Sequence, residues 1–164
     1  MQRHKLIHNK YFIYLITLYL VGLIFGIILI KPSNVNYINS EKNFFTIFFS
    51  NYWYVFVIWL FGFSIIGLFT TTLIVFFRAF IFGGLLKVLA VNNFQQFALM
   101  LFIELVFAMP LLIIVSFISL NMSSVNIKIS IYGNHDTINF NKYINLMIII
   151  TILIVIYSFI IYLN

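Results

Sequence analysis

The sequence has very few charged residues and no cysteine. Of its 164 residues only 7% are charged and 64% are hydrophobic, whereas an average globular domain has about 25% and 45–50%. This composition excludes a soluble domain. The lack of cysteine excludes a disulfide framework and a thiolate metal site, and it leaves the redox compartment open.

Long apolar runs without any charge separate the few charged residues. They cover residues 11–30, 43–77, 88–103, 105–127 and 143–164. The longer runs approach or exceed the ~20 apolar residues that a membrane-spanning helix needs. Because lipid cannot hydrogen-bond the backbone, helices are the structure that such runs favour. We therefore expect residues 1–164 to form one all-α, polytopic transmembrane helical bundle, with no room for a separate soluble catalytic domain.

We predict four spans and one short re-entrant or interfacial element. The spans are placed at about 11–30, 53–77, 94–120 and 143–163, and the short element at 79–91. The short element holds Gly83 and Gly84 and is too short to cross the membrane. A polar loop, Asn121 to Lys142, precedes the last span. The alternative is five spans, with a break near Thr70–Thr72 that places Arg78 inside the membrane, although threonines can bond their own helix without ending it.

Two segments have a second interpretation. Arg3, Lys5 and Lys10 precede the first apolar run as in a signal peptide, but that run exceeds the roughly 7–15 residues of a signal core and is interpreted as a retained span. Residues 44–49 hold four phenylalanines behind a candidate N-cap, Ser40. They form either a short interfacial helix or the early start of the second span.

The positive charge indicates orientation rather than nucleic-acid binding. The net charge is +6, but the basic residues are scattered between apolar runs and form no stripe with stacking aromatics, so we expect no nucleic-acid partner. Arg3, Lys5 and Lys10 favour a cytoplasmic N-terminus. With four spans, both termini lie on that side.

Glu104 is the most informative residue. It lies about ten residues into the expected third span, ~15 Å deep and near the bilayer midplane. A charge there costs ~2.5–3.5 kcal/mol on insertion scales, so protonation, Arg78, Lys87 or a wet cavity must compensate it. It is either a proton, ion or substrate site or a neutral side chain hydrogen-bonded between helices. Pro110 frees a carbonyl nearby and can kink the helix.

Small residues indicate close helix packing. Gly22 and Gly26 form a Gly-x-x-x-Gly pair, and Gly62 and Gly67 lighten one side of the expected second span. Such residues let helix backbones approach within the bundle or across a homodimer.

No catalytic motif occurs in the sequence, including the zinc-protease, serine-hydrolase and phosphate-binding patterns. We therefore expect no enzyme activity, no cofactor and no metal. His4 and His8 supply only two ligands, which do not close a metal site. His135 and Asp136 indicate a turn first and the acid/base pair of a membrane-embedded hydrolase second.

Short motifs taken in order resemble the integral-membrane family named after stage II sporulation protein M. Residues 46–51 resemble its Ile-Phe-x-x-Asn approach to the second span, with Phe48 and Asn51 in place. Gly62 stands where a mid-span glycine is expected.

The second half of the resemblance includes the unusual charges. Residues 78–83 are similar to the family's Asn-Gly-Phe-x-x-Gly, keeping Phe80 and Gly83 but replacing the first two residues by Arg78 and Ala79. Glu104 and the leucine after it stand where the family has Glu-Leu-Pro, here without the preceding Pro-His-Gly run. The resemblance covers about residues 44–116.

The resemblance implies a multi-pass protein of the bacterial cell membrane without known catalysis. In spore formers the family member is a scaffold that localises cell-wall hydrolases during engulfment, whereas small relatives beside circular bacteriocins assist maturation, export or immunity. Because the Pro-His-Gly run is missing, we favour the bacteriocin type. The implied partners are the lipid bilayer, membrane proteins of transport or cell-wall machinery, a second copy, and a peptide cargo. The alternative is a small ion-coupled transporter using Glu104 and the segment around Gly83 and Gly84.

Overall fold

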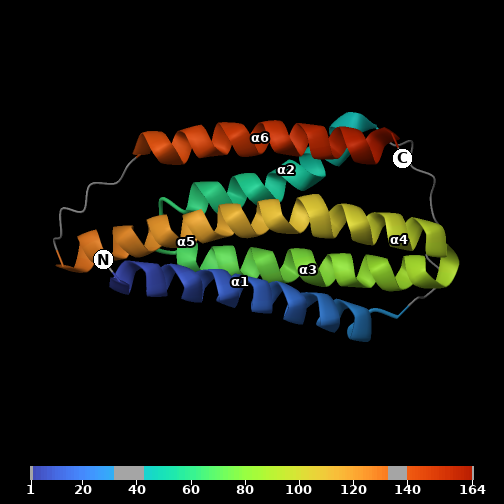
Figure 1. The fold of residues 1–164 in the computed structure, drawn as a ribbon, viewed down its shortest axis with the longest axis horizontal. Helices are drawn as coiled ribbons and strands as arrows, with labels where there is room; N and C mark the ends of the chain where they lie inside the picture. The colour runs from blue at the N-terminus through green and yellow to red at the C-terminus, as the bar shows by residue number, and fades with distance from the viewer. Residues whose placement is uncertain (1, 32–42, 133–139, 164) are drawn as a thin grey trace. The chain divides into compact units, whose positions relative to one another are not determined.

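The protein is all-helical in the part of the chain that the structure describes (Figure 1). The computed structural model describes the backbone of residues 2–31, 43–132 and 140–163, and the side chains of these except 2–9, 132, 140 and 142. The all-α class expected from the sequence is confirmed. The elements are α1 (Gln2–Leu29), α2 (Phe44–Phe61), α3 (Gly67–Asn92), α4 (Phe94–Ile103), the π-helix η1 (Glu104–Ala108), α5 (Met109–Tyr132) and α6 (Phe140–Leu163).

Among the described residues, five helical segments are long and apolar enough to cross a membrane. They are Lys10–Leu29, Phe44–Phe61, Gly67–Asn92, Phe94–Ile131 and Tyr143–Leu163. This agrees with the five-span alternative. The expected second span, 53–77, is interrupted, because α2 ends at Phe61 and α3 begins at Gly67. Thr70 lies inside α3, where its hydroxyl donates to the Ile66 carbonyl at 3.2 Å, so the threonines do not form the break.

The expected re-entrant element, 79–91, is part of the continuous helix α3. The stretch was expected to be re-entrant because it is too short to cross the membrane by itself. Glycine in a helix interior costs about 1 kcal/mol relative to alanine, yet α3 contains Gly83 and Gly84. In the structure both glycines are buried. A Cβ atom on Gly83 would collide with the Leu23 carbonyl, and one on Gly84 with the Ile30 side chain. Close packing against α1 therefore accounts for the glycines without any break in the helix.

The expected polar loop, 121–142, is largely helical as well. α5 continues to Tyr132 and α6 begins at Phe140, while residues 133–139 are outside the described part. Ser123 and Asn126 lie in α5 because their side chains have hydrogen-bond partners inside the protein, described below.

The phenylalanine-rich segment forms the first turns of α2 rather than a separate interfacial helix. Its N-cap is Asn43, whose side-chain oxygen accepts a hydrogen bond from the Phe45 backbone N–H at 3.2 Å. Ser40, the expected cap, lies outside the described residues.

The chain divides into two compact units. Unit 1 comprises Met1–Tyr37 and Thr72–Ile113, and unit 2 comprises Ile38–Thr71 and Ile114–Asn164. Unit 1 therefore holds α1, most of α3, α4, η1 and the first residues of α5. Unit 2 holds α2, the first turn of α3, most of α5 and α6. Each unit is described by itself.

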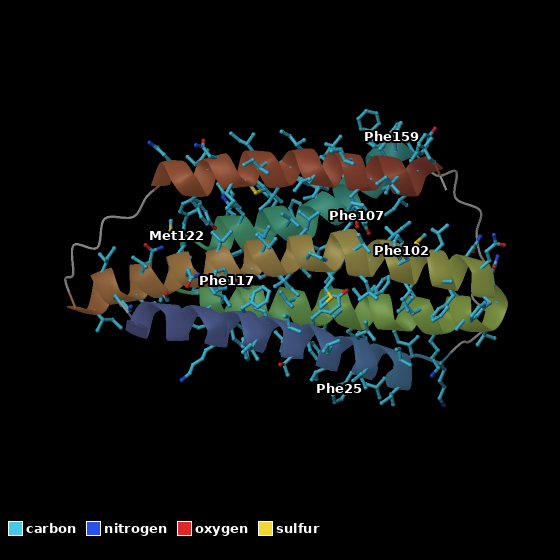
Figure 2. All side chains as sticks on the ribbon, in the orientation of Figure 1. Phe25, Phe102, Phe107, Phe117, Met122 and Phe159 are labelled. Carbon is cyan, nitrogen blue, oxygen red and sulfur yellow. The ribbon has the colours of Figure 1, made fainter. Side chains whose placement is uncertain are left out.

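In unit 1, α1 lies beside α3 along a narrow seam (Figure 1). Within residues 10–29 of α1, whose side chains are described, the buried residues are Leu15, Tyr19, Gly22 and Gly26. Large apolar side chains cover its other faces. Phe25, labelled in Figure 2, is one of them and is 48% exposed. An exposed apolar surface of this kind suits lipid as the surrounding solvent.

In unit 2, α2 packs against α6 through aromatic side chains. The rings of Trp59 and Tyr143 stack with centroids 5.6 Å apart, and the Phe44 ring meets the Phe159 ring edge-on at 6.4 Å. Phe159 also points outward from α6 (Figure 2), and 51% of it is exposed. Both ends of the α2–α6 contact are therefore fixed by ring pairs.

Candidate functional site

The carboxylate of Glu104 joins three helical segments of unit 1. The Tyr19 hydroxyl of α1 donates a 2.7 Å hydrogen bond to Oε1 of Glu104. A guanidinium nitrogen of Arg78 in α3 donates to Oε2 at 3.3 Å and forms a salt bridge. We call Tyr19, Arg78 and Glu104 the Glu104 cluster. It connects α1, α3 and the α4–η1 junction through one side chain.

The three residues of the Glu104 cluster lie at similar distances from the first residues of their candidate spans. Tyr19, Arg78 and Glu104 come nine, eleven and ten residues after Lys10, Gly67 and Phe94, the first residues of their candidate spans. At about 1.5 Å per residue these positions are ~14–17 Å along each helix. All three residues therefore lie within candidate membrane spans, two to three helical turns from the first residue of each span.

Burial differs between the two charged partners. The Glu104 side chain is 4% exposed and that of Arg78 is 15% exposed. The Arg78 guanidinium also lies over the Phe82 ring, 5.9 Å from its centroid, which gives a cation–π contact within α3. Glu104 is thus enclosed, while Arg78 forms the outer side of the pair.

Of the two basic residues expected near Glu104, the structure pairs Arg78 with it. Lys87 instead donates to the Ile28 carbonyl at 3.5 Å, in the last turn of α1. A lysine at this place suits the negative end of a helix dipole.

Glu104 is also the first residue of the π-turn η1. The Met109 backbone N–H donates to the Glu104 carbonyl, five residues earlier. Pro110 has no N–H, so it cannot donate to the Val106 carbonyl as an α-helix would require. A π-turn before Pro110 accommodates this missing donor, and π-turns are frequent at functional sites. Glu104 and Pro110, the two unusual residues of the expected third span, are therefore connected by one π-turn.

The predicted packing glycines of unit 1 meet along the α1–α3 seam. A Cβ atom on Gly22 would lie 2.7 Å from the Phe76 carbonyl oxygen, and one on Gly26 would collide with the Phe80 carbonyl. Gly83 and Gly84 face Leu23 and Ile30 of α1 and its C-terminal connection, as described above. The Gly-x-x-x-Gly pair therefore packs α1 against α3 of the same chain.

The other two predicted glycines lie at the ends of the α2–α3 turn in unit 2. A Cβ atom on Gly62 would collide with the Tyr143 hydroxyl and lie 2.9 Å from the Ser119 hydroxyl oxygen. One on Gly67 would collide with the Phe61 carbonyl. These glycines permit the turn itself to pack tightly.

Polar side chains of α5 and α6 bond the backbone carbonyls at this turn. Ser119 donates to Ile58 at 2.8 Å, Ser123 to Ser64 at 2.7 Å, Asn126 to Phe63 at 3.0 Å and Tyr143 to Trp59 at 2.6 Å. We call Ser119, Ser123, Asn126 and Tyr143 the turn-capping set. Non-helical backbone within a membrane protein must be satisfied in this way.

Sequence reasoning missed Tyr19 and the turn-capping set. Ser119, Ser123 and Asn126 recur at intervals of four and three residues, which places them on one helical face. That spacing was a usable signal. Tyr19 is one of ten tyrosines in the chain and follows no motif, so it gave none.

The remaining family-motif residues are not all gathered at one site. Phe48 stacks on Phe44 and Tyr52 within α2, and Asn51 donates to the Ile47 carbonyl at 2.9 Å. These residues belong to unit 2, whereas Phe80, Gly83 and Glu104 belong to unit 1. Phe80 stacks on Phe76 in α3.

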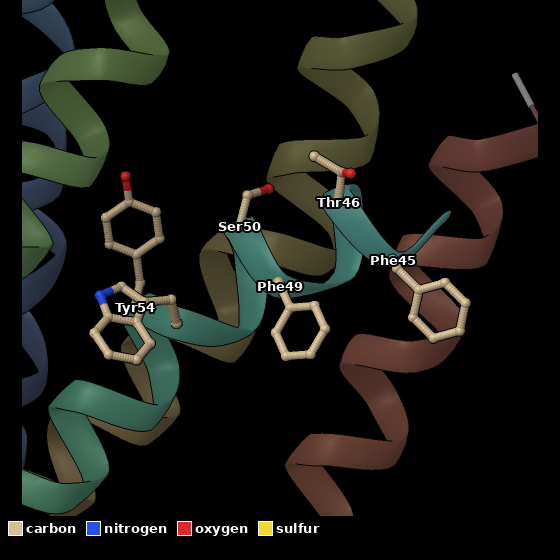
Figure 3. Close-up of a pocket in the computed structure, with 6 residues that line it drawn as sticks. Phe45, Thr46, Phe49, Ser50 and Tyr54 are labelled. Atoms are coloured by element: carbon tan, nitrogen blue, oxygen red, sulfur yellow. The ribbon is translucent and has the colours of Figure 1, made fainter. Parts of the chain in front are cut away.

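An open hollow of about 680 Å³ lies along α2. Figure 3 shows Phe45 and Phe49 on one side of the helix and Thr46, Ser50 and Tyr54 on the other. Trp53 completes the lining. All six residues come from one helix, and two of them, Phe45 and Phe49, belong to the phenylalanine-rich segment 44–49.

Four residues that were considered as metal ligands or as an acid/base pair lie, entirely or with their side chains, outside the described part of the structure. His135 and Asp136, and the side chains of His4 and His8, lie outside the described part. Within the described residues no group of three histidine, cysteine, aspartate or glutamate side chains is placed to hold a metal ion.

Comparison with known proteins gives one positive result. No curated protein and no solved structure matches the chain significantly. The family model described as stage II sporulation protein M matches residues 15–161. This match includes α2, α3, α4 and η1 in full, and with them all three residues of the Glu104 cluster. The chain is a multi-pass helical membrane protein, and it belongs to the stage II sporulation protein M family.

Proposed function

We propose that the protein is a non-enzymatic accessory subunit of the bacterial cell membrane. Its task is to assist maturation, export or immunity of a secreted peptide such as a circular bacteriocin. Family membership supports the accessory role. The observation that carries this proposal is the set of hydrogen bonds that the buried polar groups make within the protein. The buried carboxylate joins helices, and the hydroxyl and amide groups of the turn-capping set bond backbone carbonyls. Groups used in this way hold helices together, which supports an accessory role for the protein.

Deletion of the gene tests this proposal. We expect loss of secreted antimicrobial activity, or killing of the producing cells by their own peptide, and rescue by a plasmid copy. A matched control carries Tyr14→Phe, because Tyr14 lies on α1 with 48% exposure and outside the Glu104 cluster. Normal secretion and normal immunity in the deletion strain would contradict the proposal.

The sporulation role is the alternative within the same family. A scaffold that recruits cell-wall hydrolases predicts an arrest of engulfment and mislocalised hydrolases in the deletion strain. Gentle solubilisation and affinity purification separate the two roles further. A cell-wall hydrolase as the stable partner favours the sporulation scaffold, whereas a transport protein or the peptide favours the bacteriocin role. A chain that is strictly alone and monomeric contradicts both.

A second candidate function is ion-coupled transport through Glu104. The observation that favours it is a buried ion pair between two candidate membrane spans, since intramembrane charges commonly mark ion pathways. Transport that continues unchanged after Glu104→Gln would remove this candidate.

A further inference from the structure

We propose that the turn between α2 and α3 is a surface for lipid hydrocarbon. The turn ends inside the acyl-chain layer of the membrane, and its exposed side chains contact acyl chains instead of water or a soluble protein. It comprises residues 62–66 and, together with the turn-capping set, lies wholly within unit 2. The surface is the same whether the protein is an accessory subunit or a transporter.

The carbonyl groups of the turn need no water. Every carbonyl oxygen from Ile58 to Ile66 accepts a hydrogen bond within unit 2. The turn-capping set donates to the carbonyls of Ile58, Trp59, Gly62, Phe63, Ser64 and Ile65. Backbone N–H groups donate to those of Leu60, Phe61 and Ile66. Water can satisfy the free carbonyls at a helix end, whereas in hydrocarbon the protein itself must do so.

The exposed side chains of the turn and of the first residues of α3 are large and apolar. Ile65, Ile66 and Phe69 are 51%, 61% and 68% exposed. Residues 43–77 contain no charge, whereas loops at a membrane surface usually carry polar and charged side chains. An apolar surface without charge is complementary to hydrocarbon, which is itself uncharged.

The α5 helix extends beyond the turn. Its capping residues follow one another along the helix, from Ser119, which bonds α2, to Asn126, which bonds the turn. The helix then continues to Tyr132, ~9 Å farther. Its one charged residue, Lys128, is exposed and comes after all the capping residues. The charged end of unit 2 on α5 therefore lies past the turn.

The length of α2 agrees with a turn that stops short of the water. Its 18 residues make a helix of ~27 Å, and a hydrocarbon core is about 30 Å thick. Because α3 returns the chain to the side from which α2 starts, the depth of the turn does not alter the side of any other segment. Asn92 therefore lies on the same side of the membrane in either case.

Spin labelling distinguishes lipid, water and protein as surroundings of the turn. The chain has no cysteine, so a nitroxide can be attached to a single one introduced by Ile65→Cys or Ile66→Cys. The full chain is placed in phospholipid nanodiscs, which leave both membrane surfaces open, and circular dichroism checks that its helices persist. Oxygen concentrates in hydrocarbon and a polar nickel chelate stays in water. The collision rates of the label with these two reagents therefore report what surrounds it.

Two exposed positions of the same chain serve as references. Ile152→Cys marks an apolar face of α6, where the parent side chain is 56% exposed. Asn92→Cys marks the polar end of α3.

We expect both turn labels to collide with oxygen as often as the label in Ile152→Cys. They should collide with the nickel chelate several-fold less often than the label in Asn92→Cys. Frequent collisions with the chelate would place the turn in water and overturn the proposal. Rare collisions with both reagents would mean that protein covers the turn, which would overturn lipid as its partner.

An introduced charge gives a second test. Ile66→Asp places a short carboxylate at the turn, and this side chain cannot extend to water as a lysine does. A charge in hydrocarbon is costly, so the midpoint of thermal unfolding in nanodiscs should fall. Ile131→Asp is the matched control, because Ile131 is 67% exposed and lies beyond Lys128, and it should leave the midpoint unchanged. Equal midpoints for the two variants would overturn the proposal.

Discussion

The hydroxyl of Tyr19 and the carboxylate of Glu104, 85 positions apart in the sequence, are joined by a buried hydrogen bond of 2.7 Å. The same carboxylate contacts Arg78 through its other oxygen. One side chain thus ties α1 to the α4–η1 junction and that junction to α3. These three side chains form a polar cluster within unit 1.

Removal of the Tyr19 hydroxyl should weaken the attachment of α1. We expect Tyr19→Phe to lower the free energy of unfolding by about 1–2 kcal/mol, because a bond to a charged acceptor is lost in a buried place. The measurement is unfolding of the protein in mixed micelles. Tyr14→Phe is the matched control, since that ring is exposed on the same helix. Equal effects of the two changes would contradict the assignment.

The ion pair should show strong coupling in a double-mutant cycle. Arg78→Leu and Glu104→Leu each leave one buried charge without its ionic partner and should destabilise the fold by about 3–5 kcal/mol. The double variant should lose much less than the two changes added together. Strictly additive losses would mean that Arg78 and Glu104 do not depend on one another.

The close approach of α1 and α3 should not tolerate a methyl group. Gly26→Ala and Gly83→Ala both place a Cβ atom against a backbone carbonyl of the opposite helix. We expect each to lower the free energy of unfolding by about 1–3 kcal/mol through overpacking. Ile24→Ala, at a 52% exposed position of α1, is the control and should change little. Wild-type stability of both glycine variants would show that the helices are not in contact there.

The turn between α2 and α3 should depend on the turn-capping set. Ser119→Ala removes the hydroxyl that donates to the Ile58 carbonyl and also contacts Thr71 at 3.0 Å, and it should cost about 1–3 kcal/mol. The control is Ser124→Ala, because the Ser124 hydroxyl bonds the Asn121 carbonyl within its own helix. We expect only the first change to speed proteolysis at the turn. The reverse order of effects would refute this role.

The sequence was sufficient to predict an all-helical membrane protein, because charge-free apolar runs have few other structures available in lipid. It also singled out Glu104 and Arg78, since charges inside apolar runs are easily seen. Their pairing was not predictable from the four-span division, which placed Arg78 at the membrane surface. The missed break at residues 62–66 holds neither proline nor charge, and Gly62 and Gly67 were interpreted as packing residues of one helix.

The polar segment after residue 120 was interpreted as a loop for a related reason. A polar side chain indicates an exposed loop only if it has no hydrogen-bond partner inside the protein. Ser123 and Asn126 bond carbonyls of the α2–α3 turn, about 60 residues earlier in the chain. No local pattern states where such carbonyls will lie, so this part of the fold required the structure.

Five spans change the expected arrangement of charges across the membrane. Five basic residues then fall on the side of the N-terminus, namely Arg3, Lys5, Lys10, Lys128 and Lys142. Three fall on the other side, namely Lys31, Lys42 and Lys87, while Arg78 lies within the membrane. This bias predicts a cytoplasmic N-terminus and opposite sides for the two ends of the chain.

The most direct test of five spans, and hence of an Arg78–Glu104 pair inside the membrane, is cysteine labelling. The chain has no cysteine, so a single one introduced by Asn92→Cys or Asn134→Cys can be labelled in intact cells with a maleimide that does not cross membranes. Five spans with a cytoplasmic N-terminus predict labelling in Asn92→Cys and none in Asn134→Cys until the cells are opened. Labelling in Asn134→Cys, with protection in Asn92→Cys, would contradict this account.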